Sequence, residues 1–162
     1  MNTARLVSLC ILIIFLITSC KKDENPSSPN NPNPNNCNYT TDIVVVSGTS
    51  SNIVKVHSQA IGAGYIIEFL TDTSAAPTGV ALSFNGSASP AAGDYTIEPD
   101  IANVTAGKVY VEYYDPATAW RGMSGTVKVT ASGALKVITF CNQELVATAT
   151  NKKTVSLHGT TN

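Results

Sequence analysis

The chain has 162 residues, with 10 Lys and Arg, 11 Asp and Glu, and a formal net charge of −1 at pH 7. This near-neutral balance argues against a nucleic-acid-binding protein, which normally carries a basic face. The sequence also lacks a basic amphipathic segment of the kind that binds membrane surfaces.

The first predicted element is an export signal over residues 1–19. Arg5 gives it a positive start, and an apolar run over residues 6–17 follows, broken only by Ser8. This run is short of the roughly 20 residues that span a bilayer as a helix, and its layout is typical of export signals. A secretory signal cut elsewhere and an uncleaved anchor are the alternatives, but an A-x-A-like cleavage site is missing.

The signal ends in Ile17-Thr18-Ser19-Cys20, which resembles the lipobox of bacterial lipoproteins. The resemblance implies that Cys20 begins the mature chain and carries a diacylglyceryl group, usually with a further acyl chain such as palmitate. Because two or more chains anchor a protein stably, we expect lipidation at Cys20 to hold the protein on a membrane. Loss of Arg5 with the signal leaves 9 basic against 11 acidic residues, a formal charge of −2.

The next four residues are Lys21, Lys22, Asp23 and Glu24. They resemble the lysine-plus-acidic export signal that follows the lipidated cysteine in surface lipoproteins of the Bacteroidota. The resemblance implies a lipid-anchored protein of the outer membrane, displayed at the cell surface. The periplasmic face of the outer membrane is the alternative, with the four charges acting as a solvated spacer.

Residues 20–36 form a predicted tether. Its stretch over residues 25–36 holds four prolines and no aliphatic or aromatic residue, so it cannot bury enough surface to offset its ordering entropy. At roughly 3.1 Å per residue, residues 21–36 could extend about 50 Å. The tether is either a stalk that lifts the domain off the membrane or a linker whose length has no function. Both interpretations place a domain boundary near Cys37.

Residues 37–162 are enough for a single domain with one core. Two cysteines fall in this domain, Cys37 and Cys141. Outside the cytoplasm a pair of cysteines favours a disulfide, and closing a loop of about 100 residues contributes about 4–5 kcal/mol in the chain-entropy model. Two free thiols are the alternative.

The domain alternates apolar and polar residues in short runs separated by Gly, Pro, Asn, Asp and Ser, which is typical of β-strands. The inward positions include Val80, Leu82 and Phe84 in one strand and Val127 and Val129 in another. The expected strands cover residues 39–46, 53–57, 65–71, 80–85, 94–97, 108–114, 125–131, 135–140, 143–150 and 154–158. We therefore expect an all-β fold, an antiparallel β-sandwich of about 8–10 short strands, with an up-and-down calycin-like barrel as the alternative.

Several turn and strand motifs of the domain resemble small uncharacterised β-domains of Bacteroidota lipoproteins. They are Pro-x-x-Gly-x-Tyr at residues 90–95, Ser-Gly-Thr-Val-x-Val at residues 124–129, and a closing strand near Ser156 and Leu157. These motifs describe turns and strands, so the resemblance implies no activity.

Catalytic signatures are missing from the sequence. It contains no G-x-S-x-G, H-E-x-x-H, C-x-x-C, P-loop or dinucleotide fingerprint. His57 and His158 have no motif partner nearby, and Asp94, Glu98 and Asp100 lack the ligand density of a calcium loop. A glycosidase would need two carboxylates roughly 5–10 Å apart, for which Glu98, Asp100, Glu112 and Asp115 are available. We therefore expect no catalytic residue, no cofactor, no metal and no enzymatic activity.

One cluster suggests a possible binding patch, formed by Tyr110, Glu112, Tyr114, Trp120 and Arg121. The first three share one face of a predicted strand, and the last two follow in a predicted loop. Exposed aromatic side chains with a polar end suit binding surfaces, including stacking on sugars. Alternatively, the tyrosines cover a neighbouring strand and Trp120 closes the end of the core.

These features predict a lipid-anchored cell-envelope protein that displays a β-domain for binding or for a structural role at the outer surface. Its expected partners are the membrane, through the anchor, and a glycan or an envelope protein; nucleic acid is excluded. Two alternatives stay open: a hydrolase acting on glycans or peptides, and a calycin-like carrier or inhibitor with an apolar pocket.

Overall fold

The fold is known from a computed structural model, which describes residues 38–162. The predicted signal, Cys20, the charged run at residues 21–24, the tether and Cys37 lie outside the described residues. The proposed Cys37–Cys141 disulfide therefore stays a prediction.

The described chain is all-β, as the alternation predicts. A 3-10 turn, η2 (Ile101–Asn103), interrupts the strands. The strands are β1 (Ile43–Val46), β2 (Thr49–Asn52), β3 (Lys55–Ile61), β4 (Gly64–Leu70), β5 (Gly79–Asn85), β6 (Gly93–Ile97), β7 (Lys108–Tyr114), β8 (Ala119–Gly122), β9 (Thr126–Ser132), β10 (Leu135–Val146) and β11 (Lys152–Thr161). None of the helical segments in residues 38–162 has the length and hydrophobicity to cross a membrane.

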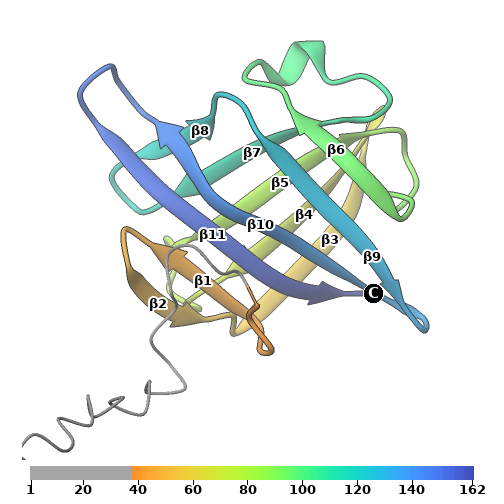
Figure 1. Cartoon of the computed structure of the whole chain (residues 1–162), viewed down its shortest axis with the longest axis horizontal. Helices are drawn as coiled ribbons and strands as arrows, with labels where there is room; N and C mark the ends of the chain where they lie inside the picture. The colour runs from red at the N-terminus through yellow and green to blue at the C-terminus, as the bar shows by residue number, and fades with distance from the viewer. Residues whose placement is uncertain (1–37) are drawn as a thin grey trace, which may run out of the picture. The chain divides into compact units, whose positions relative to one another are not determined.

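The strands follow the order β2-β1-β11-β10-β9-β6-β7-β5-β4-β3, with β8 pairing to both β10 and β7. Neighbours are antiparallel except β6 and β7, which are parallel. Two layers result. Strands β1, β9, β10 and β11 form the first layer, and β3, β4, β5 and β7 cross behind them as the second layer (Figure 1). The expected sandwich is thus an 11-stranded mixed sheet folded into a partial ring.

One bent segment joins the two layers at one side. Its first half, β2, pairs with β1 in the first layer, and its second half, β3, pairs with β4 in the second layer. At the corner, the Ile53 amide donates to the Asp42 carbonyl and the Val54 amide donates to the Leu70 carbonyl. At the other side β6 and β8 each pair with strands of both layers. Strands that switch sheets at a bend are the usual corners of such folds.

The core lies between the inner faces of the two layers. Val80, Leu82 and Phe84 alternate inward from β5, as predicted. The layers are in direct contact, since a Cβ placed on Gly159 of β11 would overlap the ring of Phe69 of β4. Large buried side chains from both layers fill this interior, namely Ile67, Phe69, Leu82, Ile138, Leu145 and Leu157.

The last hairpin differs from the expected one. The sequence suggests a turn over residues 151–153, but Lys152 and Lys153 already belong to β11. The turn lies between Val146, where β10 ends, and Lys152, where β11 begins. A hydrogen bond from the Ala147 amide to the Asn151 carbonyl closes it. The expected strands over residues 125–131 and 135–140 leave a short Gly-containing connection, and this connection is a hairpin turn, because Ser132 pairs with Leu135 across Gly133 and Ala134.

Candidate functional site: the tyrosine face

The outer surface of the second layer carries most of the predicted binding patch. Strand β7 alternates, burying Val109, Val111 and Tyr113 and leaving Tyr110, Glu112 and Tyr114 half-buried on the outside. Register then fixes the neighbours: Ala81 of β5 lies opposite both Glu68 and Glu112, and Arg121 of β8 lies opposite Glu112. We call this surface the tyrosine face; it comprises Glu68, Ala81, Ser83, Tyr110, Glu112, Tyr114 and Arg121.

Both tyrosines of this face are held by carboxylates. The Tyr110 hydroxyl donates to Glu112 Oε2 at 2.9 Å, and the Tyr114 hydroxyl donates to Glu68 Oε1 at 3.4 Å. Tyr114 reaches Glu68 across β5 because Gly79 has no side chain there: a Cβ at Gly79 would lie 3.2 Å from the Tyr114 hydroxyl. The ring of Tyr114 therefore rests on the sheet.

The same contacts raise the tyrosine pKa values. Burial is the largest cause for both residues, followed by the neighbouring carboxylates: Glu112 for Tyr110 and Glu68 for Tyr114. Together they raise the pKa of each hydroxyl to about 12. Both hydroxyls therefore stay protonated at neutral pH and act as hydrogen-bond donors in fixed directions.

A groove of about 300 Å³ adjoins the tyrosine face at the end of β5. Ser83 belongs to both, because it lines the groove and pairs with Tyr110 across β5 and β7. The walls of the groove are mostly apolar and include Ile66 together with Ile61 and Ile101, two of the exposed large hydrophobic side chains. A polar face thus continues into an apolar groove.

Trp120 does not belong to this surface, which corrects the predicted patch. The expected loop is strand β8, whose alternation buries Trp120 and exposes Arg121. The indole Nε1 donates to Asn151 Oδ1 at 2.9 Å, and Lys153 Nζ lies 3.9 Å from the centroid of the Trp120 ring. Trp120 closes one end of the core, as the alternative interpretation predicts.

Three of the four carboxylates considered for a glycosidase contact nearby chain segments. Glu98 pairs with Lys108 at 2.7 Å, and this hydrogen bond is the largest cause of the lowered pKa of Glu98. Asp100 caps η2 by accepting from the Ala102 amide. Asp115 accepts from the amides of Ala117 and Thr118. Each therefore already has a role in holding a turn or a strand.

The two histidines lie in different layers. His57 of β3 is 3.7 Å from Glu68, measured from Nδ1 to Oε2, beside the tyrosine face. His158 of β11 is 3.9 Å from Asp42 in the first layer. Within the described part of the chain, no group of three or more His, Cys, Asp and Glu side chains could hold a metal ion.

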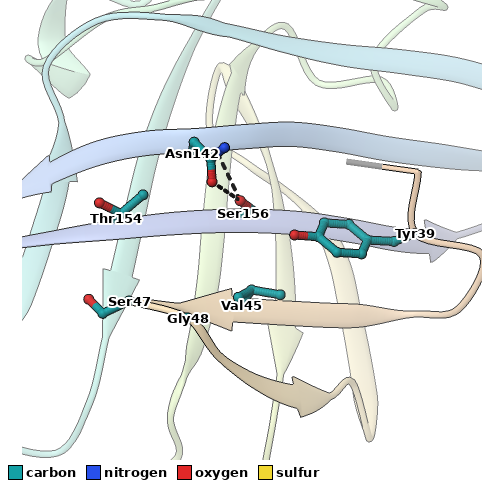
Figure 2. Close-up of a pocket in the computed structure, with 7 residues that line it drawn as sticks. All are labelled: Tyr39, Val45, Ser47, Gly48, Asn142, Thr154 and Ser156. Atoms are coloured by element: carbon teal, nitrogen blue, oxygen red, sulfur yellow. Dashed lines mark hydrogen bonds between the residues drawn. The ribbon is translucent and has the colours of Figure 1, made fainter. Parts of the chain in front are cut away.

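A second cavity, which the sequence does not reveal, opens on the outer face of the first layer. Figure 2 shows it between β1, β10 and β11, with the ring of Tyr39 at one side. Its volume is about 240 Å³. The lining side chains come from four separate segments, so no local motif marks the cavity.

No family model, curated protein or solved structure matches the chain.

Proposed function

We propose that this chain is a lipid-anchored protein of the bacterial outer membrane whose β-domain binds a ligand, such as a glycan, through the tyrosine face. The lipobox at Cys20 and the charged run after it support the anchor and the surface display. The tyrosine face supports binding, and the groove that adjoins it at Ser83 is the observation that carries the proposal.

The chemistry of this surface suits a ligand that has both hydroxyl groups and apolar patches. The Tyr110 hydroxyl gives its one proton to Glu112, so its oxygen and the remaining lone pairs of Glu112 are acceptors for ligand hydroxyls. Arg121 adds a cationic donor opposite Glu112, and the groove takes an apolar part of the ligand. Binding sites typically combine an apolar lining with a few such polar groups. A carrier would instead need a hollow interior, and here Ile67, Phe69 and Leu82 fill it.

Substitution of Tyr110 tests the ligand face. On a glycan array, Tyr110→Ala should bind at least one of the retained glycans about tenfold more weakly, because the ring and its hydroxyl are both lost from the tyrosine face. Tyr110→Phe removes the hydroxyl and keeps the ring, so it separates the contribution of the hydroxyl to binding from that of the ring. Lys128→Ala, on the outer face of the other layer, is the matched control and should bind as the native protein does. Equal binding of every retained glycan by Tyr110→Ala and the native protein would exclude this face as the binding surface.

Substitution of Cys20 tests the anchor. Cys20→Ala should move the protein from the membrane fraction to the soluble fraction, since the lipid attachment point is gone. Cys10→Ala removes a cysteine of the signal itself and should leave the protein on the membrane. Membrane association of Cys20→Ala equal to that of Cys10→Ala would refute lipid anchoring and would leave the tyrosine face unaffected.

A further inference from the structure

The cavity of the first layer is a separate, electrically neutral site. It lies over β1, β10 and β11 (Figure 2), in the layer opposite to that of the tyrosine face. Among the described residues that form it, none carries a formal charge at neutral pH. Its lining includes the side chains of Tyr39, Val45, Ser47, Asn142, Thr154 and Ser156.

Asn142 owes its position to a β-bulge. The register between β10 and β11 shifts between Phe140 and Gln143, and Asn142 adopts a left-handed backbone with φ of 47°. Asparagine tolerates this conformation better than most residues, and bulges commonly redirect a side chain. The bulge is fixed from β11, because the buried Ser156 hydroxyl accepts from the Asn142 amide at 2.8 Å.

The wall opposite Asn142 is a tight turn. Ser47 and Gly48 join β1 to β2 with φ of 48° and 87°, which are the positive values of the hairpin turns that suit twisted strands. The Ser47 amide donates to the Thr154 carbonyl at 2.7 Å. This bond fixes the turn beside β11 and brings the hydroxyls of Ser47 and Thr154 to the same cavity.

The polar groups of the cavity leave donors and acceptors for a ligand. Asn142 Oδ1 accepts from the Ser156 hydroxyl at 3.3 Å. The two N–H groups of the Asn142 side-chain amide are then left to donate to a ligand. Within residues 38–162, the hydroxyls of Tyr39, Ser47 and Thr154 make no side-chain hydrogen bond. Hydroxyls both donate and accept, so the rim offers both kinds of partner at several points.

The apolar part of the cavity is the Tyr39 ring and the buried Val45. Aromatic faces pack against apolar C–H surfaces, and a tyrosine adds a polar end. A charged ligand would be desolvated here without an opposite charge in the cavity, which is unfavourable. A pyranose ring, by contrast, has hydroxyls around its edge and C–H groups on its face.

From this combination we propose that the cavity binds one neutral sugar ring, with the C–H face of the ring on Tyr39 and its hydroxyls at Asn142, Ser47 and Thr154. A volume of about 240 Å³ is below the usual range for a whole drug-sized ligand, so one ring enters and any further sugar units stay outside. The proposal is independent of the tyrosine face.

An NMR titration that follows individual backbone amides of the domain tests sugar binding in this cavity. The probes are glucose, galactose and N-acetylglucosamine, with glucose 6-phosphate as the charged counterpart. At least one neutral sugar should shift the amides of Val45, Ser47 and Asn142 saturably, and the phosphate should do so more weakly. Tyr39→Ala should weaken this binding about tenfold. Asn142→Gly allows the same left-handed backbone but removes the side-chain amide, so it should also weaken binding.

Tyr110→Ala is the matched control from the opposite layer and should leave the titration unchanged. The amide spectrum of each variant first shows that the fold is intact. The proposal is overturned if no neutral sugar gives saturable shifts at the cavity. It is equally overturned if binding survives Tyr39→Ala and Asn142→Gly unchanged, or depends on Tyr110 instead.

Discussion

Single residues hold the loops of this domain, and Asp72 is the clearest case. Its carboxylate accepts from the Ser74 hydroxyl at 2.6 Å, from the Ser74 amide at 3.0 Å and from the Thr78 amide at 2.9 Å. These bonds, led by the Ser74 side chain, lower the pKa of Asp72 from 3.8 to about 2. The ionised carboxylate accepts these bonds more strongly than the protonated acid would, so the loop between β4 and β5 is held best when Asp72 is ionised.

The lowered pKa predicts a pH-dependent stability contribution from Asp72. Because the folded pKa lies below the unfolded one, the contribution is complete above about pH 4 and is lost as pH falls toward 2. Urea unfolding should show Asp72→Asn to be less stable than the native protein at pH 7, with a difference that shrinks toward pH 2. A difference independent of pH would mean that the charge of Asp72 does not stabilise the loop.

At the scale of single strands, close packing between the layers limits the size of the side chains that β11 can have on its inner face. Gly159 lies against the ring of Phe69, so a side chain at this position would displace that ring. Gly159→Ala should lower the free energy of unfolding by about 1–3 kcal/mol, the usual range for overpacking a core. Chemical denaturation measures the change.

Gly64→Ala in β4 is the matched control for Gly159. Its new methyl group would have its nearest contact at 3.3 Å, the carbonyl oxygen of Phe84, so the effect should be smaller. If the two variants were equally stable, the close approach of β11 to β4 at Phe69 would not limit stability.

Strand alternation predicts some elements well and misses others for identifiable reasons. Alternation predicts a strand over residues 108–114, and β7 has those bounds. It does not predict β8, because this strand has only four residues, lies close to a proline, and forms by pairing with β7 and β10. Strand β2 has no apolar residue at all and depends on β1 in the same way.

At the scale of the whole domain, both layers share one core, so stability should respond to core changes and much less to the tyrosine face. Phe69→Ala should destabilise the domain by about 3–5 kcal/mol, through lost burial and the cavity left between the layers. Tyr110→Ala removes a half-buried side chain of the outer face and should cost much less. Urea unfolding followed by tryptophan fluorescence of the buried Trp120 compares the two variants. Equal losses would contradict the division into core and ligand face.

The tyrosine face could be predicted only in part. The sequence places Tyr110, Glu112 and Tyr114 on one side of a strand because side chains alternate with a fixed period of two. It cannot say that Glu68 lies beside Tyr114, since these residues are 46 positions apart. Nor can it tell that Trp120 faces inward, because this depends on the pairing of β8.

The sequence by itself determined the all-β class and the inward faces of the strands, because each depends on local composition or on neighbours along the chain. The lipid anchor at Cys20 stays a prediction from the sequence. Only the tertiary structure decided which strands pair, which carboxylates hold the tyrosines, and where Asn142, Ser47 and Tyr39 meet around a cavity. Those outcomes depend on contacts between distant segments, whose register is set by how the whole core packs.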